Sequence, residues 1–154
     1  MRDINPLSLI FGITMIFMIS ACGETETNII KWQDQKAGIK AWEKKTTNGV
    51  TTITHYYPSG MKMKQEDFDG LKRHGKSIKW YENGIIESEK TFEYGQKIGT
   101  HKSFYNNGQI SSQKHFAQGQ KNGVWSYYLV TGEQWRIETY DVGSLASAES
   151  FDIK

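Results

Sequence analysis

Four histidines could serve as general bases or metal ligands, so they are the first residues to consider for chemistry. They are His55, His74, His101 and His115. Within the 24-residue repeat described below they occupy four different positions, and strand alternation sends His101 and His115 to opposite faces of a sheet. A metal site needs ligands that converge on one point. We therefore predict no metal site, and we interpret the four as histidines of solvated strands or loops.

Two carboxylates, Glu87 and Glu89, are the second candidates, because residues two apart lie on the same face of a strand. Such a pair can act as acid and base on a glycosidic bond. However, the residues 24 positions later are Ser111 and Gln113, and the neighbouring lysines are typical of a solvated face. The sequence also lacks a Ser-His-Asp pattern and a Gly-x-x-x-x-Gly-Lys-Ser/Thr phosphate loop. We predict that the protein is not an enzyme and uses no cofactor.

The single cysteine, Cys22, excludes a disulfide framework and a zinc site built from paired thiolates. It follows the charged Arg2, an apolar run over residues 7–19 and the small residues Ser20 and Ala21. This order is typical of a secretory signal peptide. The alternative is a retained transmembrane helix, which needs about 20 predominantly apolar residues. Proline, glycine and serine interrupt this stretch, so we favour the signal peptide.

The residues before Cys22, Ile-Ser-Ala, resemble a bacterial lipobox. The resemblance implies that residues 1–21 are a lipoprotein signal peptide, that the chain is cut just before Cys22, and that this thiol carries diacylglycerol. Burial of lipid contributes about 0.8 kcal/mol per methylene, so two or three acyl chains would hold the protein firmly to a membrane. Gly23 gives no obvious retention signal, which favours the outer membrane or cell surface over the inner membrane. The alternative is a free thiol that falls at this position by coincidence.

The balance of charge bears on the class of partner. The 154 residues include 19 Lys and Arg against 17 Asp and Glu, a formal net charge of +2. Proteins that bind nucleic acid usually carry a strong basic excess. We therefore expect no nucleic-acid partner.

The glycines and aromatic residues recur at a fixed interval of 24 residues. The glycine sets are Gly60, Gly84, Gly108 and Gly132; Gly75, Gly99 and Gly123; and Gly95, Gly119 and Gly143. The aromatic sets are Tyr56, Trp80, Phe104 and Tyr128; Tyr57, Tyr81 and Tyr105, completed by Leu129; and Phe68, Phe92, Phe116 and Tyr140. A fixed period is the signature of a repeat architecture. We predict units near 51–74, 75–98, 99–122 and 123–146, and a C-terminal half unit at 147–154.

Each unit has the pattern of a β-hairpin. Two strand-like runs flank Asn83-Gly84, a dipeptide that favours the two positive φ values of a type I′ turn. A two-residue loop there would pair Trp80 with Glu87 and Tyr81 with Ile86. Successive hairpins predict an all-β fold over residues 42–154, a single-layer antiparallel meander stabilised by stacking between equivalent side chains. We expect residues 22–41 to be a tether or N-terminal segment whose later, more apolar part docks on the array.

The 24-residue unit resembles the MORN repeat variant of bacterial proteins. The resemblance is carried by the Tyr-x-Asn-Gly turn, by the aromatic residue and glycine that follow it, and by Gly123-Val124-Trp125. The Gly-x-Trp motif is complete only in the last full unit, since Ser77 and His101 occupy the tryptophan position in the two units before it. The family implies an array of β-hairpins without catalytic residues. Some of its members are described as antitoxin components.

One aromatic set is a candidate binding stripe: Tyr56, Trp80, Phe104 and Tyr128. In the predicted register these side chains lie on one face, about 10 Å apart, beside polar residues. Exposed aromatic residues among polar groups mark interaction sites. The alternative is that the stripe belongs to the core and packs against a crossing segment from residues 23–41.

The sequence as a whole predicts a membrane-anchored, non-enzymatic lipoprotein of the bacterial cell envelope. Its partners would be the membrane, through the lipid on Cys22, and a protein that binds the repeat scaffold. An alternative is a module that binds glycan or peptidoglycan through the aromatic stripe. A further alternative is an antitoxin or immunity-type protein, although a lipid anchor disfavours a cytoplasmic toxin as partner.

Overall fold

The protein is a single antiparallel β-sheet. The structure is a computed structural model that describes residues 13–19 and 25–152, with side chains from Glu26 onward. The sheet has 13 strands. They are β1 (Ile13–Ile19), β2 (Thr25–Asp34), β3 (Ile39–Thr47), β4 (Val50–Tyr56), β5 (Lys62–Asp69), β6 (Lys72–Trp80), β7 (Ile86–Glu93), β8 (Gln96–Phe104), β9 (Ile110–Ala117), β10 (Gln120–Lys121), β11 (Gly123–Tyr128), β12 (Gln134–Asp141) and β13 (Ser144–Ser150).

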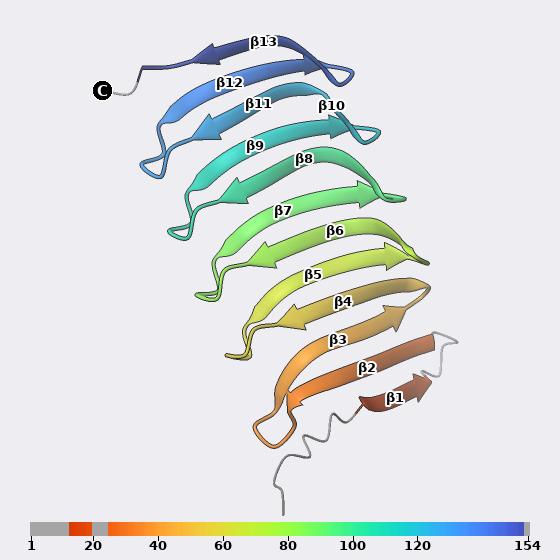
Figure 1. The fold of residues 1–154 in the computed structure, drawn as a ribbon. Helices are drawn as coiled ribbons and strands as arrows, with labels where there is room; N and C mark the ends of the chain where they lie inside the picture. The colour runs from red at the N-terminus through yellow and green to blue at the C-terminus, as the bar shows by residue number, and fades with distance from the viewer. Residues whose placement is uncertain (1–12, 20–24, 153–154) are drawn as a thin grey trace, which may run out of the picture.

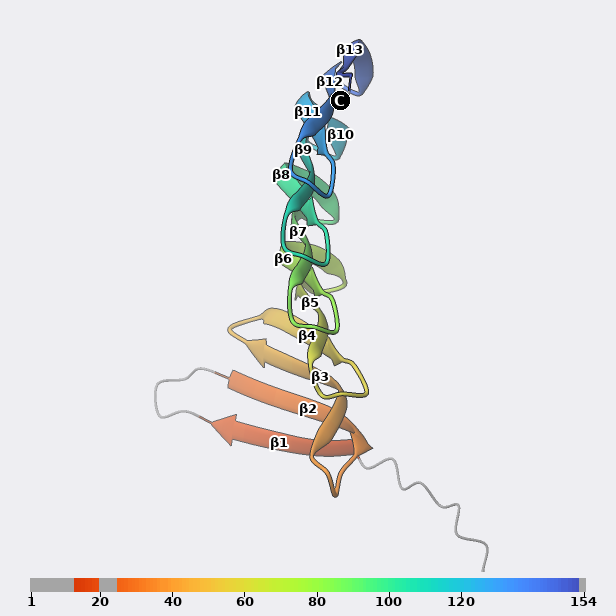
Figure 2. The same cartoon turned by 90° about the vertical axis from the view of Figure 1, so that its left-hand side faces the viewer.

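The strands follow one another across the sheet in chain order, and only β10 lies off this path, paired with β9 (Figure 1). The array is one layer thick, as the view along the strands shows (Figure 2). It also twists along its length, because β1–β3 lie across this view whereas the later strands are seen nearly end-on. The predicted all-β, single-layer meander is confirmed.

The turns along one edge differ from the predicted type I′ turn. After β6, the N–H of Gly84 donates to the carbonyl of Tyr81 at 2.9 Å, and the N–H of Tyr81 donates to the carbonyl of Ile85 at 2.8 Å. Gly84 has a φ of 84°, whereas Asn83 is not among the residues with positive φ. These bonds define a three-residue loop, a type I turn closed by a glycine bulge. The prediction was wrong because Asn-Gly suits this loop as well as the two-residue one.

Type I′ turns are found along the opposite edge of the sheet. There, pairs of residues with positive φ join consecutive strands: Asn48-Gly49, Tyr94-Gly95, Gln118-Gly119 and Val142-Gly143. The glycine of each later turn also binds the preceding unit, since the N–H of Gly95 donates to the carbonyl of Arg73 at 2.8 Å. Glycines therefore recur at 24-residue steps along both edges of the sheet, because the turns of both edges need a residue with positive φ.

The predicted register holds along most of the β6–β7 hairpin but fails next to the turn. Gly75 pairs with Phe92, as the predicted register requires. Trp80, however, pairs with Ile86 rather than Glu87, because a β-bulge lies between Lys79 and Trp80. The extra residue of the longer loop shifts the pairing by one position. Trp80 and Ile86 consequently share one face of the sheet.

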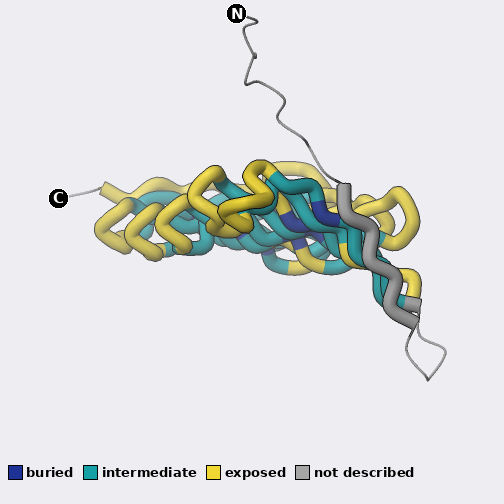
Figure 3. Tube along the Cα trace, turned by 90° about the horizontal axis from the view of Figure 1, so that it is seen from below, coloured by how far each residue is buried: buried dark blue, intermediate teal, exposed yellow. Residues whose placement is uncertain are grey.

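The two faces of the sheet are unequally buried. The stack face bears the rings Phe92, His101, Phe116, Trp125 and Tyr140, which contact one another in this order along the array. The stripe face is the opposite one and bears Tyr56, Trp80, Phe104 and Tyr128. Most buried residues lie in the middle of the strands, and the turns at both edges are exposed (Figure 3). Stability therefore comes from contacts between neighbouring units rather than from a deep core.

The segment expected to be a tether, residues 22–41, contains a strand of the sheet. β2 pairs with β3 along most of its length, and Ile30 is buried. β2 also pairs with β1, which comes from the predicted signal peptide. Cys22 and the rest of residues 20–24 lie outside the described residues. At the other end, β13 pairs with β12 and contains the first residues of the predicted half unit at 147–154.

Candidate functional site

The four residues of the candidate stripe occupy equivalent places at the ends of β4, β6, β8 and β11. Each is the last residue of its strand, next to the three-residue loops: Tyr56, Trp80, Phe104 and Tyr128. Each side chain is half-buried, so none is fully sequestered in a core. The structure thus aligns the four on one face, as the spacing predicts.

The residue after each stripe member forms a bond between units. The hydroxyls of Tyr57, Tyr81 and Tyr105 donate to the backbone carbonyls of the stripe residues one unit further on, each at 2.8 Å. Tyr81, for example, binds the carbonyl of Phe104. Leu129, which completes this set in the sequence, has no hydroxyl. These bonds fix the spacing of the stripe, and the tyrosine column in the sequence was their only signal.

Tyr56 is tied to the first strands of the array. Its hydroxyl donates to Glu43 at 2.9 Å, and Glu43 also accepts bonds from Asn28 and Lys40. Burial and the Glu43 carboxylate together raise the pKa of Tyr56 to about 12. Burial alone would raise the pKa of Glu43, but the hydrogen bonds from its partners outweigh this effect and lower it. The phenol of Tyr56 therefore stays protonated, and its hydrogen bond to Glu43 fixes the position of the ring.

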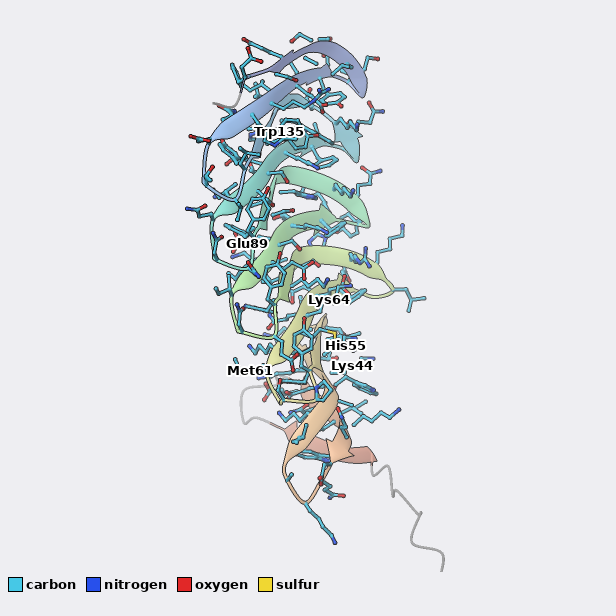
Figure 4. All side chains as sticks on the ribbon, turned by 60° about the vertical axis from the view of Figure 1, so that its left-hand side comes forward. Lys44, His55, Met61, Lys64, Glu89 and Trp135 are labelled. Carbon is cyan, nitrogen blue, oxygen red and sulfur yellow. The ribbon has the colours of Figure 1, made fainter. Side chains whose placement is uncertain are left out.

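A shallow hollow of about 360 Å³ lies between the first two stripe residues. It is lined by Tyr56, Gly60, Met61, Lys62, Trp80 and Gly84. The ammonium of Lys62 lies 5.7 Å from the centroid of the Trp80 ring. Met61, which Figure 4 labels, follows the turn after β4. Its side chain is exposed. Phe104 and Tyr128 do not line this hollow. Its lining combines two aromatic walls with one ammonium group.

The ring ladder of the stack face was not predicted from the sequence. Ring centroids lie 5.8 Å apart for Phe92 and His101, 4.6 Å for His101 and Phe116, 5.1 Å for Phe116 and Trp125, and 4.8 Å for Trp125 and Tyr140. The tilted arrangement is the one that aromatic pairs prefer. The indole N–H of Trp125 donates to the carbonyl of His115 at 2.9 Å. The ladder thus links three successive units.

His101 is buried rather than solvated, so its predicted exposure was wrong. It is only 5% exposed, and its Nε2 forms a 3.0 Å hydrogen bond with the carbonyl of Thr91. Burial lowers the pKa of His101. His115 lies on the other face, where its Nδ1 contacts the hydroxyl of Thr100 at 3.0 Å. Within residues 26–152, no group of His, Cys, Asp and Glu side chains is arranged to hold a metal ion.

The carboxylates Glu87 and Glu89 have different neighbours. Glu87 forms an ion pair with Lys79 at 2.8 Å. Glu89 pairs with Ile78 and lines a different hollow, beside Lys76. The bulge next to the turn separates the two carboxylates, which the predicted register placed on one face.

Comparison with known families identifies the repeat. The sequence profile described as the MORN repeat variant matches residues 73–94 and 97–118. These two segments are similar to the MORN repeat variant. They correspond to the hairpins β6–β7 and β8–β9, and each MORN unit ends at a type I′ turn. No curated protein matches the chain.

The hairpins outside the matched segments share the geometry of the MORN units. The loops after β4 and β11 carry the same two backbone hydrogen bonds as the loop after β6. In the described part of the chain, no helix is long and apolar enough to span a membrane. The described chain is thus an array of consecutive β-hairpins, two of which match the MORN repeat variant.

Proposed function

We propose that the protein is a non-enzymatic lipoprotein of the bacterial cell envelope whose MORN-type array binds a protein partner. The observation that carries this proposal is the single-layer sheet. From β2 to β13 the array extends for about 50 Å at about 4.8 Å per strand, with two long faces that no other layer covers within the described residues. Side chains that could act together in a reaction are separated, as Glu87 and Glu89 are, or buried, as His101 is.

The anchor proposed at Cys22 would hold the array close to the membrane. β2 begins at Thr25, three residues after Cys22, and three extended residues span about 10 Å. Cleavage before Cys22 would also remove β1, which pairs with β2 in the uncut chain. The mature sheet would then begin with β2 as an edge strand next to the lipid.

Cross-linking in intact cells tests the partner. A tagged chain is cross-linked, recovered from the envelope fraction and compared with the Cys22→Ala chain, which keeps the array but loses the anchor. We expect one protein to be enriched with the natural chain and lost with Cys22→Ala. Equal recovery with both chains, or no enriched protein, would contradict the proposal. A toxin-like protein as the partner would favour the antitoxin or immunity role over a general scaffold.

A glycan ligand is a second candidate, favoured by the hollow between Tyr56 and Trp80. A polysaccharide pull-down distinguishes it, because Trp80 lines the hollow and Phe104, at the equivalent place one unit later, does not. Recognition there would be lost in Trp80→Ala and retained in Phe104→Ala. If the natural chain is not retained on peptidoglycan or envelope polysaccharide, the glycan role is wrong.

A further inference from the structure

The stack face carries a row of lysines without carboxylate partners. Lys90, Lys97, Lys114 and Lys121 lie on four successive strands, β7, β8, β9 and β10. In the described part of the chain none of the four forms an ion pair. The ion pairs of this face are Lys64 and Arg73 with Glu66, Lys79 with Glu87, and Arg136 with Glu138. The row is therefore a strip of positive charge whose ammonium groups form no ion pair with the described residues.

Three of these lysines cover the aromatic ladder. The ammonium of Lys97 lies 4.9 Å from the centroid of the Phe116 ring. Those of Lys114 and Lys121 lie 5.2 and 4.6 Å from the centroid of Trp125, so two cations share one ring. The rings beneath are tilted against one another, and Trp125 is only 5% exposed. The surface consequently offers ammonium groups rather than open aromatic faces.

The charged strip is bounded at both ends. At the 24-residue step that contains Lys90 and Lys114, the first and last units carry Glu66 and Glu138 instead. The lysine row thus ends at an acidic residue on each side. From β7 to β10 the strip crosses three strand spacings, about 14 Å, which an extended peptide covers with about four or five residues.

The lysines also repel one another. Burial and the charges of Lys97, Lys64 and Arg73 lower the pKa of Lys90, against a smaller opposing effect of Glu87. Burial likewise lowers the pKa of Lys114, with repulsion from Lys121, Lys97 and Lys90 and attraction from Glu138. A bound anion would relieve this repulsion, which is the usual basis of electrostatic complementarity.

We propose that Lys90, Lys97, Lys114 and Lys121 bind an acidic, extended polypeptide segment of a partner protein. A nucleic acid or a glycan would use open rings for stacking, and the rings of this face are covered. A run of carboxylates can bind through ion pairs with ammonium groups alone, and these are the groups that the strip presents. This assignment names the chemistry of the partner of the proposed scaffold, and so it rests on that function.

Binding of a labelled oligoglutamate peptide of about six residues, slightly longer than the strip, tests the assignment with the purified full-length chain in detergent. We expect binding that weakens as salt is raised, because the charges are solvent-accessible. Lys90→Gln combined with Lys97→Gln should weaken binding about tenfold, since each lysine supplies one charge contact. The matched control is Lys76→Gln with Lys102→Gln, an equal change of charge on the stripe face, which should bind as the natural chain does. Lys90→Arg with Lys97→Arg should retain binding.

Three results would overturn the assignment. The first is that the peptide does not bind, and the second is that the control pair weakens binding equally. The third is that the protein binds polygalacturonate or anionic phosphatidylglycerol vesicles but not the peptide. Circular dichroism of each variant separates a loss of binding from a loss of fold. If the peptide does not bind but cross-linking recovers a partner, only the acidic-peptide assignment is wrong. If the peptide binds but cross-linking recovers no partner, only the scaffold role is contradicted.

Discussion

The bond between units that Tyr81 makes has a stability effect that can be measured. Its hydroxyl donates to the carbonyl of Phe104 at 2.8 Å, and Tyr57 and Tyr105 make the same bond in adjoining units. Tyr81→Phe removes only this hydroxyl, so the aromatic contacts stay. The net value of such a bond is about 1 kcal/mol. We expect Tyr81→Phe to lower the free energy of unfolding by about that amount.

The three equivalent sites also test whether the units contribute independently. Neighbouring units are about 10 Å apart, a distance at which effects usually add. The triple Tyr→Phe variant should therefore lose about 3 kcal/mol. Urea unfolding followed by circular dichroism measures it, and an unchanged slope with denaturant shows that the same surface is exposed. Tyr94→Phe is the matched control, because Tyr94 is 57% exposed and its hydroxyl donates no hydrogen bond to the described residues. Equal effects of Tyr94→Phe and Tyr81→Phe would refute the reasoning.

Three further perturbations follow from the same structure. Gly84→Ala should cost about 1–2 kcal/mol in urea unfolding, because its φ of 84° disfavours residues with a Cβ; an unchanged stability would contradict the turn geometry. Trp125→Ala should cost about 3–5 kcal/mol or prevent folding, since it removes a buried ring from the ladder; a loss below about 1 kcal/mol would mean that the ladder is not what stabilises the array. His101 has a lowered pKa in the folded state, so the unfolded chain binds the proton more readily and stability falls as pH drops below about 6.5. His101→Gln should remove this part of the pH dependence between about pH 7 and pH 5, and an identical pH profile for both chains would show that burial of His101 has no such effect.

Much of the architecture could be predicted because glycine has a unique role. Glycine adopts a positive φ at a lower energetic cost than other residues. Turns that recur every 24 residues therefore leave glycines at the same interval in the sequence. The turn type at Asn83-Gly84 could not be predicted in this way, because both loop types accept the dipeptide. The side chain of Asn83 binds the carbonyl of Asn106 in the next unit at 3.1 Å, and a single hairpin cannot reveal such a contact.

The two faces were predicted less well than the strands. Strand alternation correctly placed Gly75 and Phe92 on one face of the sheet. Because histidine is polar, however, His101 was wrongly predicted to be solvated. The repeat step held the missing signal, since Ser77, His101 and Trp125 occupy one position of the unit and all three are buried. The position of a residue in the repeat decides whether it is buried, so a polar residue at a buried position is buried as well. The four residues of the candidate stripe share one face because each ends its strand at the same step of the repeat, and their role in binding stays a prediction.

The measurement that tests the central claim most directly is the intact mass of the chain recovered from membranes, combined with metabolic labelling by a fatty-acid analogue. An envelope lipoprotein predicts a chain that begins at Cys22, carries the mass of its acyl groups and is labelled, with the label lost in Cys22→Ala. An unlabelled chain that still contains residues 1–21, or a label that remains in Cys22→Ala, would contradict the account.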